Sequence, residues 1–168
     1  MNKSWIANGF TAANALFGGL SIMMSISGEY HVAAICILIA MAADAFDGRV
    51  ARALGTAGPM GVELDSLSDD ISFGVAAGAL MYSYQLRELG ALGFIPCALL
   101  GAFCAFRLAR FNVKVTSVHG YFEGLPCPTV GVIIACYVLS GVKIWNWLAM
   151  VCVLALAAVS YTHLTLPT

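Results

Sequence analysis

The stretch DAFDGRVARALGTAGPMGVELDSLSDD, residues 44–70, decides how this chain folds. It contains six of the nine acidic residues, although only 10% of all residues are charged. The segment GTAGPMG near its middle has the glycines and the proline that are typical of a tight turn between two helices. A solvated loop would account for the charges, but it would not account for the regular intervals between the carboxylates.

Helical periodicity places these carboxylates on two faces. A helix advances about 100° per residue, so Asp44 and Asp47 share one face of the first helix. Asp65 and Asp69 likewise share a face of the second helix, whereas Asp70 points the opposite way. Four neighbouring carboxylates repel one another unless a cation lies among them, and Mg²⁺ prefers oxygen ligands. The spacing therefore predicts a site for one or two divalent metal ions at the boundary of a membrane.

The residues beside the carboxylates favour a phosphate-bearing ligand. Gly48 and Ala51 leave space on the face that carries Asp44 and Asp47, and Arg52 offers two parallel donors that suit a phosphate. This pattern favours chemistry on a phosphoanhydride. Two alternatives stay open: charged ends of membrane spans whose small residues serve helix packing, and ion coupling by carboxylates within a membrane.

The composition of the whole chain predicts an integral membrane protein. Hydrophobic residues make up 61% of the 168 residues, and soluble domains have about 25% charged residues. The net charge of −1 gives no indication of nucleic-acid binding. We expect an all-α, polytopic membrane protein with about six transmembrane helices in one bundle, formed by residues 1–168 as a single domain. The expected spans are roughly 7–27, 31–53, 62–85, 89–110, 127–142 and 144–163.

The ends and the charges of the chain suggest how it is oriented. No cleavable signal peptide is expected, so the first hydrophobic segment should remain as a span. Residues from about 160 to 168 are expected to be either a natural tail or a foreign or truncated end. Positive residues concentrate on the cytoplasmic side of membrane proteins, which would place residues 44–70 at the cytoplasm. Six basic residues fall on that side, Lys3, Arg49, Arg52, Arg107, Arg110 and Lys114, and two on the other, Arg87 and Lys143.

The cysteines and histidines give no further metal site. We expect the six cysteines to be small buried hydrophobic residues, since they lie mostly in apolar segments and form no C-x-x-C pair. His31, His119 and His163 lie too far apart for metal-ligand spacing, although His119 falls in a polar stretch near the expected active face.

Residues 44–69 resemble the CDP-alcohol phosphotransferase family. They reproduce its motif D-x-x-D-G-x-x-A-R, followed after eight residues by G-x-x-x-D-x-x-x-D. The segments ELDSLSDDISFG (63–74), RLARFN (107–112) and YFEGLPCPTVG (121–131) are similar to the phosphatidylserine synthase branch, and ANGFTAAN (7–14) to the family's first helix. The resemblance covers about residues 5–142. The chain lacks the usual proline before Asn8, and it has Ala77 where the branch often has proline.

The resemblance implies a function and a set of site residues. Such enzymes transfer a phosphatidyl group from CDP-diacylglycerol to an alcohol and release CMP. The metal residues would be Asp44, Asp47, Asp65 and Asp69, which would hold two divalent metals, Mg²⁺ or Mn²⁺, with Asp69 at the edge of the cluster. Asp69 would also take the proton of the attacking hydroxyl, with no covalent enzyme intermediate. The CDP pocket would be lined by Asn8, Thr11, Gly48, Ala51, Arg52 and Gly61.

The acceptor and the setting of the enzyme are expected as follows. The phosphatidylserine synthase branch implies L-serine as the acceptor, and Arg107, Arg110 and Asn112 are the candidates for binding it. For Arg107, an anchoring role at the membrane surface is an equal alternative. Related enzymes are usually homodimers, and the expected location is the inner membrane of a bacterium or archaeon, with the active site facing the cytoplasm.

Three other functions are alternatives to phosphatidyl transfer to serine. An enzyme of the same family could use glycerol 3-phosphate, because a phosphorylated acceptor also needs basic residues. A cation transporter would explain the aspartates, but not Gly48, Ala51 and Arg52 at their spacing. An inactive family member with a structural role would not need the complete set of aspartates.

Overall fold

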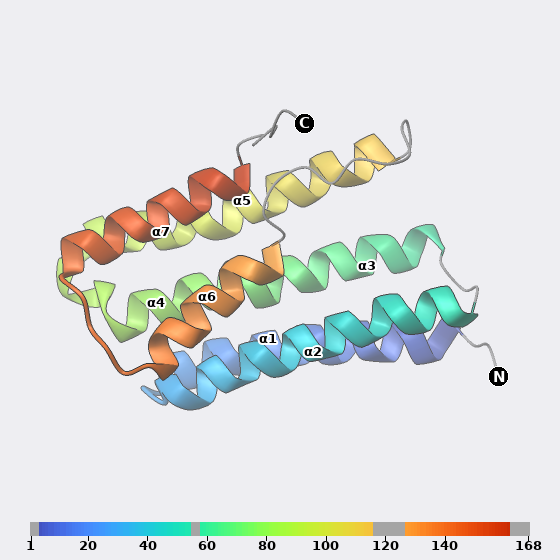
Figure 1. The fold of residues 1–168 in the computed structure, drawn as a ribbon, viewed down its shortest axis with the longest axis horizontal. Helices are drawn as coiled ribbons and strands as arrows, with labels where there is room; N and C mark the ends of the chain where they lie inside the picture. Colours follow the sequence, from blue (N-terminus) through green and yellow to red (C-terminus); the bar gives the residue numbers. More distant parts are fainter. Residues whose placement is uncertain (1–3, 55–57, 116–126, 162–168) are drawn as a thin grey trace.

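The structure, a computed structural model, describes residues 4–54, 58–115 and 127–161, and every regular element in these ranges is a helix (Figure 1). The expected all-α architecture is thus confirmed for this part of the chain. The elements are α1 (Ser4–Ile26), α2 (Tyr30–Leu54), α3 (Pro59–Asp69), the π-helical η1 (Asp70–Val75), α4 (Ala76–Tyr84), the 3₁₀-helical η2 (Leu86–Leu89), α5 (Ala91–Val115), α6 (Cys127–Leu139) and α7 (Asn146–Tyr161).

Among the described residues, three helices are long and apolar enough to cross a membrane. They contain the segments Asn8–Ile26, Tyr30–Val50 and Ala91–Arg110. Two further apolar helices, Cys127–Leu139 and Asn146–Val159, are shorter. The expected span at 62–85 corresponds to α3, η1 and α4, which follow one another without a loop. The number of about six spans therefore stays a prediction.

The rod formed by α3, η1 and α4 lies in the middle of the bundle (Figure 1). Helices α1 and α2 pack along each other on one side of this rod, and α5 and α7 pair on the other. Helix α6 packs on both α2 and η1. The core forms where these helices meet, and its largest fully buried apolar side chains include Ile37, Phe73, Leu80, Leu100 and Val138.

The turns between the helices follow the positions of glycine and proline. Gly28, between α1 and α2, has φ +85°, and Gly141, after α6, has φ +67°. Residues other than glycine rarely adopt such angles. Pro59 is the first residue of α3, where its missing N–H costs no helical hydrogen bond. The turn was expected over residues 55–61, but residues 59–61 already belong to α3, and residues 55–57 lie outside the described part.

A polar network closes the end of the bundle that is remote from residues 44–69. The buried Gln85 side chain donates to the Ile144 carbonyl and to Asn146 Oδ1, and it accepts a hydrogen bond from the Tyr137 hydroxyl. Asn146 Nδ2 donates to Glu88 Oε2 over 2.7 Å. These bonds connect the segment after α4 to the loop between α6 and α7. Because its groups are mutually satisfied, the network is a structural feature of the fold.

The prediction that all six cysteines are small buried hydrophobic residues is wrong for Cys136 and Cys152, and it missed that Cys104 and Cys127, which are buried, are bonded to each other. Cys104 of α5 and Cys127 of α6 form a disulfide, with Cα atoms 6.2 Å apart. Cys136 and Cys152 are exposed, and Cys36 and Cys97 are buried thiols. The sequence did not indicate the pair, because the two cysteines are 23 positions apart and only the packing of α6 against the rod brings them together.

Candidate metal centre

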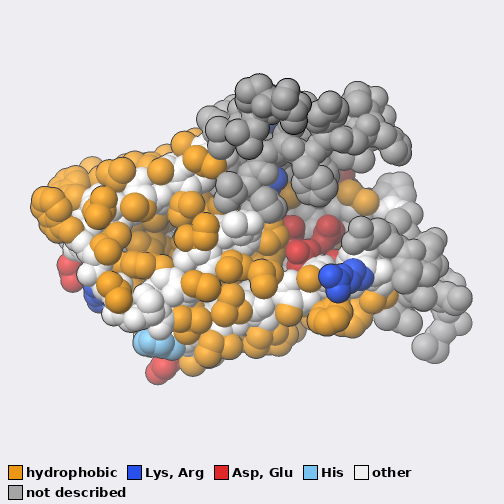
Figure 2. Space-filling view, in the orientation of Figure 1, with side chains coloured by type: hydrophobic (Ala, Val, Ile, Leu, Met, Phe, Trp, Pro, Cys, Tyr) orange, Lys and Arg blue, Asp and Glu red, His pale blue; other side chains and the backbone are white. Residues whose placement is uncertain are grey.

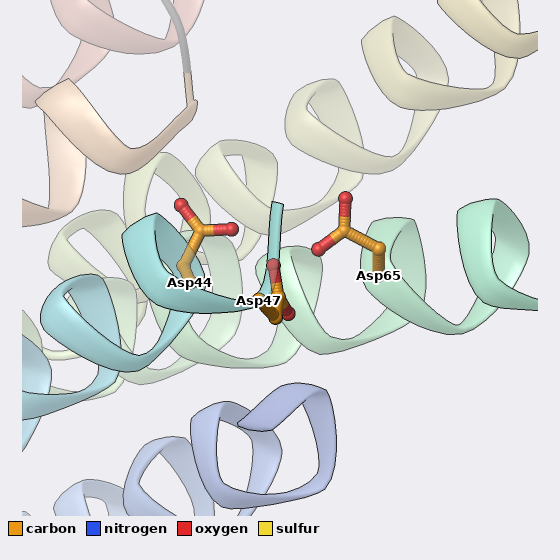
Figure 3. Close-up of side chains that lie close together, drawn as sticks. All are labelled: Asp44, Asp47 and Asp65. Atoms are coloured by element: carbon orange, nitrogen blue, oxygen red, sulfur yellow. The ribbon is translucent and has the colours of Figure 1, made fainter. Parts of the chain in front are cut away.

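Three aspartates from two helices converge at one end of the rod. Asp44 and Asp47 lie on α2 and Asp65 lies on α3, and their closest carboxylate oxygens are all within 4.8 Å of one another. In Figure 3 the carboxylates of Asp44 and Asp65 face each other, with Asp47 between them. The helical spacing predicted a shared face on each helix, and these faces meet because α3 runs in the opposite direction to α2 (Figure 1).

Asp69 completes the cluster one turn further along α3. It is only 8% exposed. Its carboxyl group lies within hydrogen-bonding range of Asp44, and Asp65 and Asp47 act on it electrostatically. Asp70, in contrast, lies beside α5, because its Oδ1 and Cys104 both border the same side of Gly74. The opposite direction expected for Asp70 agrees with this position.

The donor set fits a hard divalent cation. Three carboxyl groups lie within 4.8 Å of one another, Asp69 interacts with all three, and Asp47 is only 5% exposed. Asp65 Oδ1 is buried and has no hydrogen-bond partner among the described residues. A buried carboxylate oxygen without a partner is costly, and a cation would satisfy it. Oxygen ligands of this kind suit Mg²⁺ or Mn²⁺.

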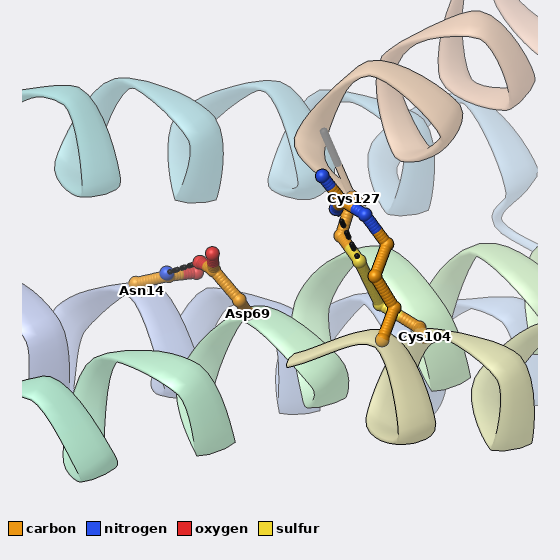
Figure 4. The surroundings of a disulfide bond; sticks show 5 residues. Asn14, Asp69, Cys104 and Cys127 are labelled. Atoms are coloured by element: carbon orange, nitrogen blue, oxygen red, sulfur yellow. Dashed lines mark hydrogen bonds between the residues drawn. A yellow bond between two sulfur atoms is a disulfide. The ribbon is translucent and has the colours of Figure 1, made fainter. Parts of the chain in front are cut away.

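Helix α1 donates hydrogen bonds to two of these carboxylates. Thr11 Oγ1 donates to Asp47 Oδ2 over 2.8 Å, and Asn14 Nδ2 donates to Asp69 Oδ1 over 3.0 Å (Figure 4). The sequence indicated Thr11 only as a residue of the nucleotide pocket, and it did not indicate Asn14. The available signal was that Asn14 lies three positions after Thr11, and hence on the same face of an otherwise apolar helix.

The expected pocket residues lie around the cluster where the structure describes them. Gly48 is exposed on α2 beside Asp47. A Cβ atom added to Gly61 would lie 4.0 Å from Asn8 Oδ1, so α1 and α3 approach each other here across a glycine. The side chains of Ala51 and Arg52 lie outside the described residues.

The three acceptor candidates on α5 differ in their positions. Arg107 is partly buried and donates from Nη1 to Cys127 Sγ over 3.3 Å, and its charge is attracted to Asp69. Arg110 is exposed. Asn112 Nδ2 donates to Ser66 Oγ over 3.0 Å, which ties α5 to α3. Arg107 is therefore the candidate whose charge acts on the cluster. His119 and the segment 121–126 lie outside the described residues.

The acidic cluster is accessible from one face of the molecule. Figure 2 shows acidic side chains in a recess with hydrophobic and basic side chains beside it. Large hydrophobic side chains cover much of the face in view, and Phe46, beside the cluster on α2, is 55% exposed. Such a surface suits contact with lipid rather than with water.

The chain belongs to the CDP-alcohol phosphatidyltransferase family, whose model matches residues 4–159. The family that the aspartate motif indicated is thus confirmed, and the match extends over nearly the whole chain. Together with the three apolar helices, family membership indicates an integral membrane protein.

Several curated relatives carry related names. The chain is 38% identical over 133 residues to a CDP-diacylglycerol–serine O-phosphatidyltransferase of Helicobacter pylori, covering 79% of this chain and 56% of that protein. It is 40% identical over 130 residues to an archaetidylserine synthase of Methanothermobacter thermautotrophicus, covering 76% of this chain and 55% of that protein. A CDP-diacylglycerol–serine O-phosphatidyltransferase of Bacillus subtilis is 38% identical over 122 residues, covering 72% of this chain and 68% of that protein. The chain spans little more than half the length of the first two relatives.

Proposed function

We propose that this protein transfers the phosphatidyl group of CDP-diacylglycerol to L-serine, giving phosphatidylserine and CMP. The observation that supports this most directly is the convergence of Asp44, Asp47 and Asp65, with Asp69 beside them, at a recess in an apolar helical surface. The choice of serine is supported by the names of relatives in bacteria and yeast, which are CDP-diacylglycerol–serine O-phosphatidyltransferases.

The site residues divide into two groups. Asp44, Asp47 and Asp65 would hold two divalent ions, Mg²⁺ or Mn²⁺, which supply charge to bind the diphosphate and offset the charge that develops on the leaving CMP. Asp69 lies at the edge of this group, where it would accept the proton of the serine hydroxyl as that oxygen attacks the β-phosphorus of the CDP-lipid. The bond from phosphorus to the CMP oxygen breaks in the same transfer, so that no residue of the protein is modified.

The nucleotide would be bound between α1, α2 and α3. Gly48 and Gly61 lack side chains beside the cluster, and Asn8 lies next to Gly61. Their small volume leaves space for a ligand at the carboxylates. Thr11 would support the pocket through its bond to Asp47, and Ala51 and Arg52 remain part of this proposal from their place in the motif.

Serine would lie on the side of the cluster that faces α5. Its carboxylate requires a positive partner, and the Arg107 guanidinium, which acts electrostatically on Asp69, is the candidate we favour. Arg110 and Asn112 would then border the pocket. Asn112 already pairs with Ser66, so its contribution would be to hold α5 in place.

We further propose how the protein lies in the membrane. The cluster lies at the end of the bundle that carries Arg49, Arg107 and Arg110, while Arg87 and Lys143 lie at the other end. This asymmetry supports a cytoplasmic active site in a bacterial or archaeal inner membrane, with about six spans. The diphosphate would reach the metals at the membrane surface while the acyl chains stay in the bilayer. A homodimer is expected from the family resemblance.

The test is an acceptor panel with the purified protein in detergent. CMP release from CDP-diacylglycerol is measured with serine, with glycerol 3-phosphate and with neither, over a range of Mn²⁺ and Mg²⁺ concentrations. Release that requires both serine and a divalent metal supports the proposal. Release with glycerol 3-phosphate but not with serine would show that the protein is an enzyme of this family whose acceptor is glycerol 3-phosphate. Metal flux into proteoliposomes without CMP release would favour a transporter.

A further inference from the structure

We propose that Asn14 is a positioning residue for Asp69: its side-chain amide fixes the orientation of the carboxylate, which is held by α1 and presented to the acceptor hydroxyl. This inference rests on the proposed function. Asn14 was not among the residues expected to bind CDP or serine. Its role would mean that α1 supports the general base as well as lining the nucleotide pocket.

The first argument is the contact itself. Asn14 is fully buried at 0% exposure, and its Nδ2 donates to Asp69 Oδ1 over 3.0 Å (Figure 4). A carboxylate can rotate about its terminal bond, and a fixed donor on one oxygen removes that freedom. Because Oδ1 is held by Asn14, the direction in which the whole Asp69 carboxyl group faces Asp44 and the remainder of the site is also fixed.

The second argument is that the backbone of Asn14 is itself held in place. Ser72 Oγ, one turn beyond Asp69, donates to the Asn14 carbonyl over 2.9 Å. One turn further along α1, Gly18 packs so tightly against Ser72 that a Cβ atom there would clash with the Ser72 side chain and backbone. Helices α1 and the rod are thus locked at the point where Asn14 meets Asp69. A side chain on a locked backbone gives the precise support that a reacting group requires.

The third argument is that the fold gains little from an asparagine at this position. Asn14 Oδ1 is buried and has no partner among the described residues. Because the carboxylate of Asp69 can only accept, Nδ2 must face Asp69 and Oδ1 must face away from it. A buried oxygen without a donor lowers stability. The presence of an amide with one unsatisfied buried oxygen is more readily explained by its contact with the site than by packing.

The experiment compares Asn14→Leu with Ser21→Ala in the full chain in detergent. Ser21 lies on the same buried face of α1, and its Oγ is likewise buried without a partner among the described residues, but no contact joins it to an aspartate. Three quantities are measured for each variant: the midpoint of thermal unfolding, Mn²⁺ binding by electron paramagnetic resonance, and steady-state CMP release at varied CDP-diacylglycerol and serine.

For Asn14→Leu we expect kcat to fall by about 10–100-fold, as for the loss of other supporting hydrogen bonds at active sites. The thermal midpoint should shift by only a few degrees, since the substitution removes the unpartnered Asn14 oxygen together with the donor to Asp69 Oδ1 and these two effects oppose each other. KM for CDP-diacylglycerol and the affinity for Mn²⁺ should stay within about threefold. Ser21→Ala should change none of the kinetic constants. Mn²⁺ binding is read without turnover, so absence of activity in the unmodified protein would count against the proposed function alone.

Two results would overturn the role of Asn14. One is a kcat for Asn14→Leu within twofold of the unmodified protein. The other is a loss of kcat that accompanies an equally marked loss of thermal stability and Mn²⁺ binding, which would make Asn14 a structural residue. If the leucine variant does not fold, Asn14→Ala is used instead; its smaller side chain leaves room for a water, and the same division between kcat and stability decides the question.

Discussion

Thr11 of α1 donates a hydrogen bond of 2.8 Å to Asp47 of α2, across 36 positions in the sequence. Asn14, one turn further along α1, makes the corresponding contact with Asp69 of α3. A single face of α1 therefore supports one carboxylate on each of the two helices that form the cluster. The first helix contributes no carboxylate of its own, but it determines how those of its neighbours are oriented.

Thr11→Val should weaken metal binding. The substitution is nearly isosteric and removes the donor to Asp47 Oδ2. We expect the Mn²⁺ concentration that gives half-maximal CMP release to rise by about 10-fold or more, because supporting partners of metal ligands commonly contribute 10–100-fold. Thr11→Ser, which keeps the hydroxyl, is the matched control and should retain most of the affinity. An unchanged metal requirement in Thr11→Val would refute the supporting role.

Asp69→Asn should nearly abolish turnover while the protein still binds metal. A positioned general base contributes about 10²–10⁴-fold, and the amide cannot accept the proton of the serine hydroxyl. Asp44, Asp47 and Asp65 remain in the variant, so Mn²⁺ should still bind. Asp70→Asn is the matched control, because the adjacent carboxyl group lies beside α5 and outside the cluster. Equal losses of kcat in both variants would argue against a specific role for Asp69.

Asp65→Asn should stabilise the metal-free protein and diminish its response to metal. In the absence of a cation the four carboxylates repel one another, and Asp65 Oδ1 has no hydrogen-bond partner among the described residues. Neutralising this group should raise the thermal midpoint in EDTA by a few degrees, since about 1 kcal/mol corresponds to about 2–4 °C for a chain of this size.

The same substitution should reduce the increase in thermal midpoint that Mn²⁺ produces, because one ligand is lost. Both quantities are measured by the fluorescence of the tryptophans during heating. Glu63→Gln serves as the control, since Glu63 is an exposed carboxylate on the same helix. A lower midpoint of Asp65→Asn in EDTA would contradict the view that repulsion dominates the metal-free cluster.

Arg107→Gln should weaken the binding of serine and leave the binding of the lipid substrate unaffected. A hydrogen bond to a charged group is worth about 1.5–3 kcal/mol, and about 1.4 kcal/mol corresponds to a factor of ten. We therefore expect KM for serine to rise by at least about 10-fold, with KM for CDP-diacylglycerol little changed. Arg87→Gln, at the opposite end of the bundle, should change neither constant. An increase confined to KM for CDP-diacylglycerol would place Arg107 at the nucleotide instead.

The helical class, the start of α3 at Pro59 and the shared face of the aspartates on each helix follow from local patterns in the sequence. Spacings of three and four residues place carboxylates on one face of a helix whatever surrounds it, and glycine and proline end helices through their own backbone angles. The π-helical turn at Asp70–Val75 has no such local cause in the sequence. It starts immediately after Asp69 and lies where α1, α5 and α6 all pack against the rod.

The sequence by itself thus determined which residues carry charge, on which helix face they lie and which family they belong to. Only the tertiary structure decided which side chains meet between helices. Thr11 and Asn14 donate to Asp47 and Asp69. Arg107 contacts Cys127, and Asn112 pairs with Ser66. The physical reason is that helical periodicity is a property of one segment. A hydrogen bond between helices depends instead on how closely and in which register two segments pack, and glycines such as Gly18 set that distance only once both helices are in place.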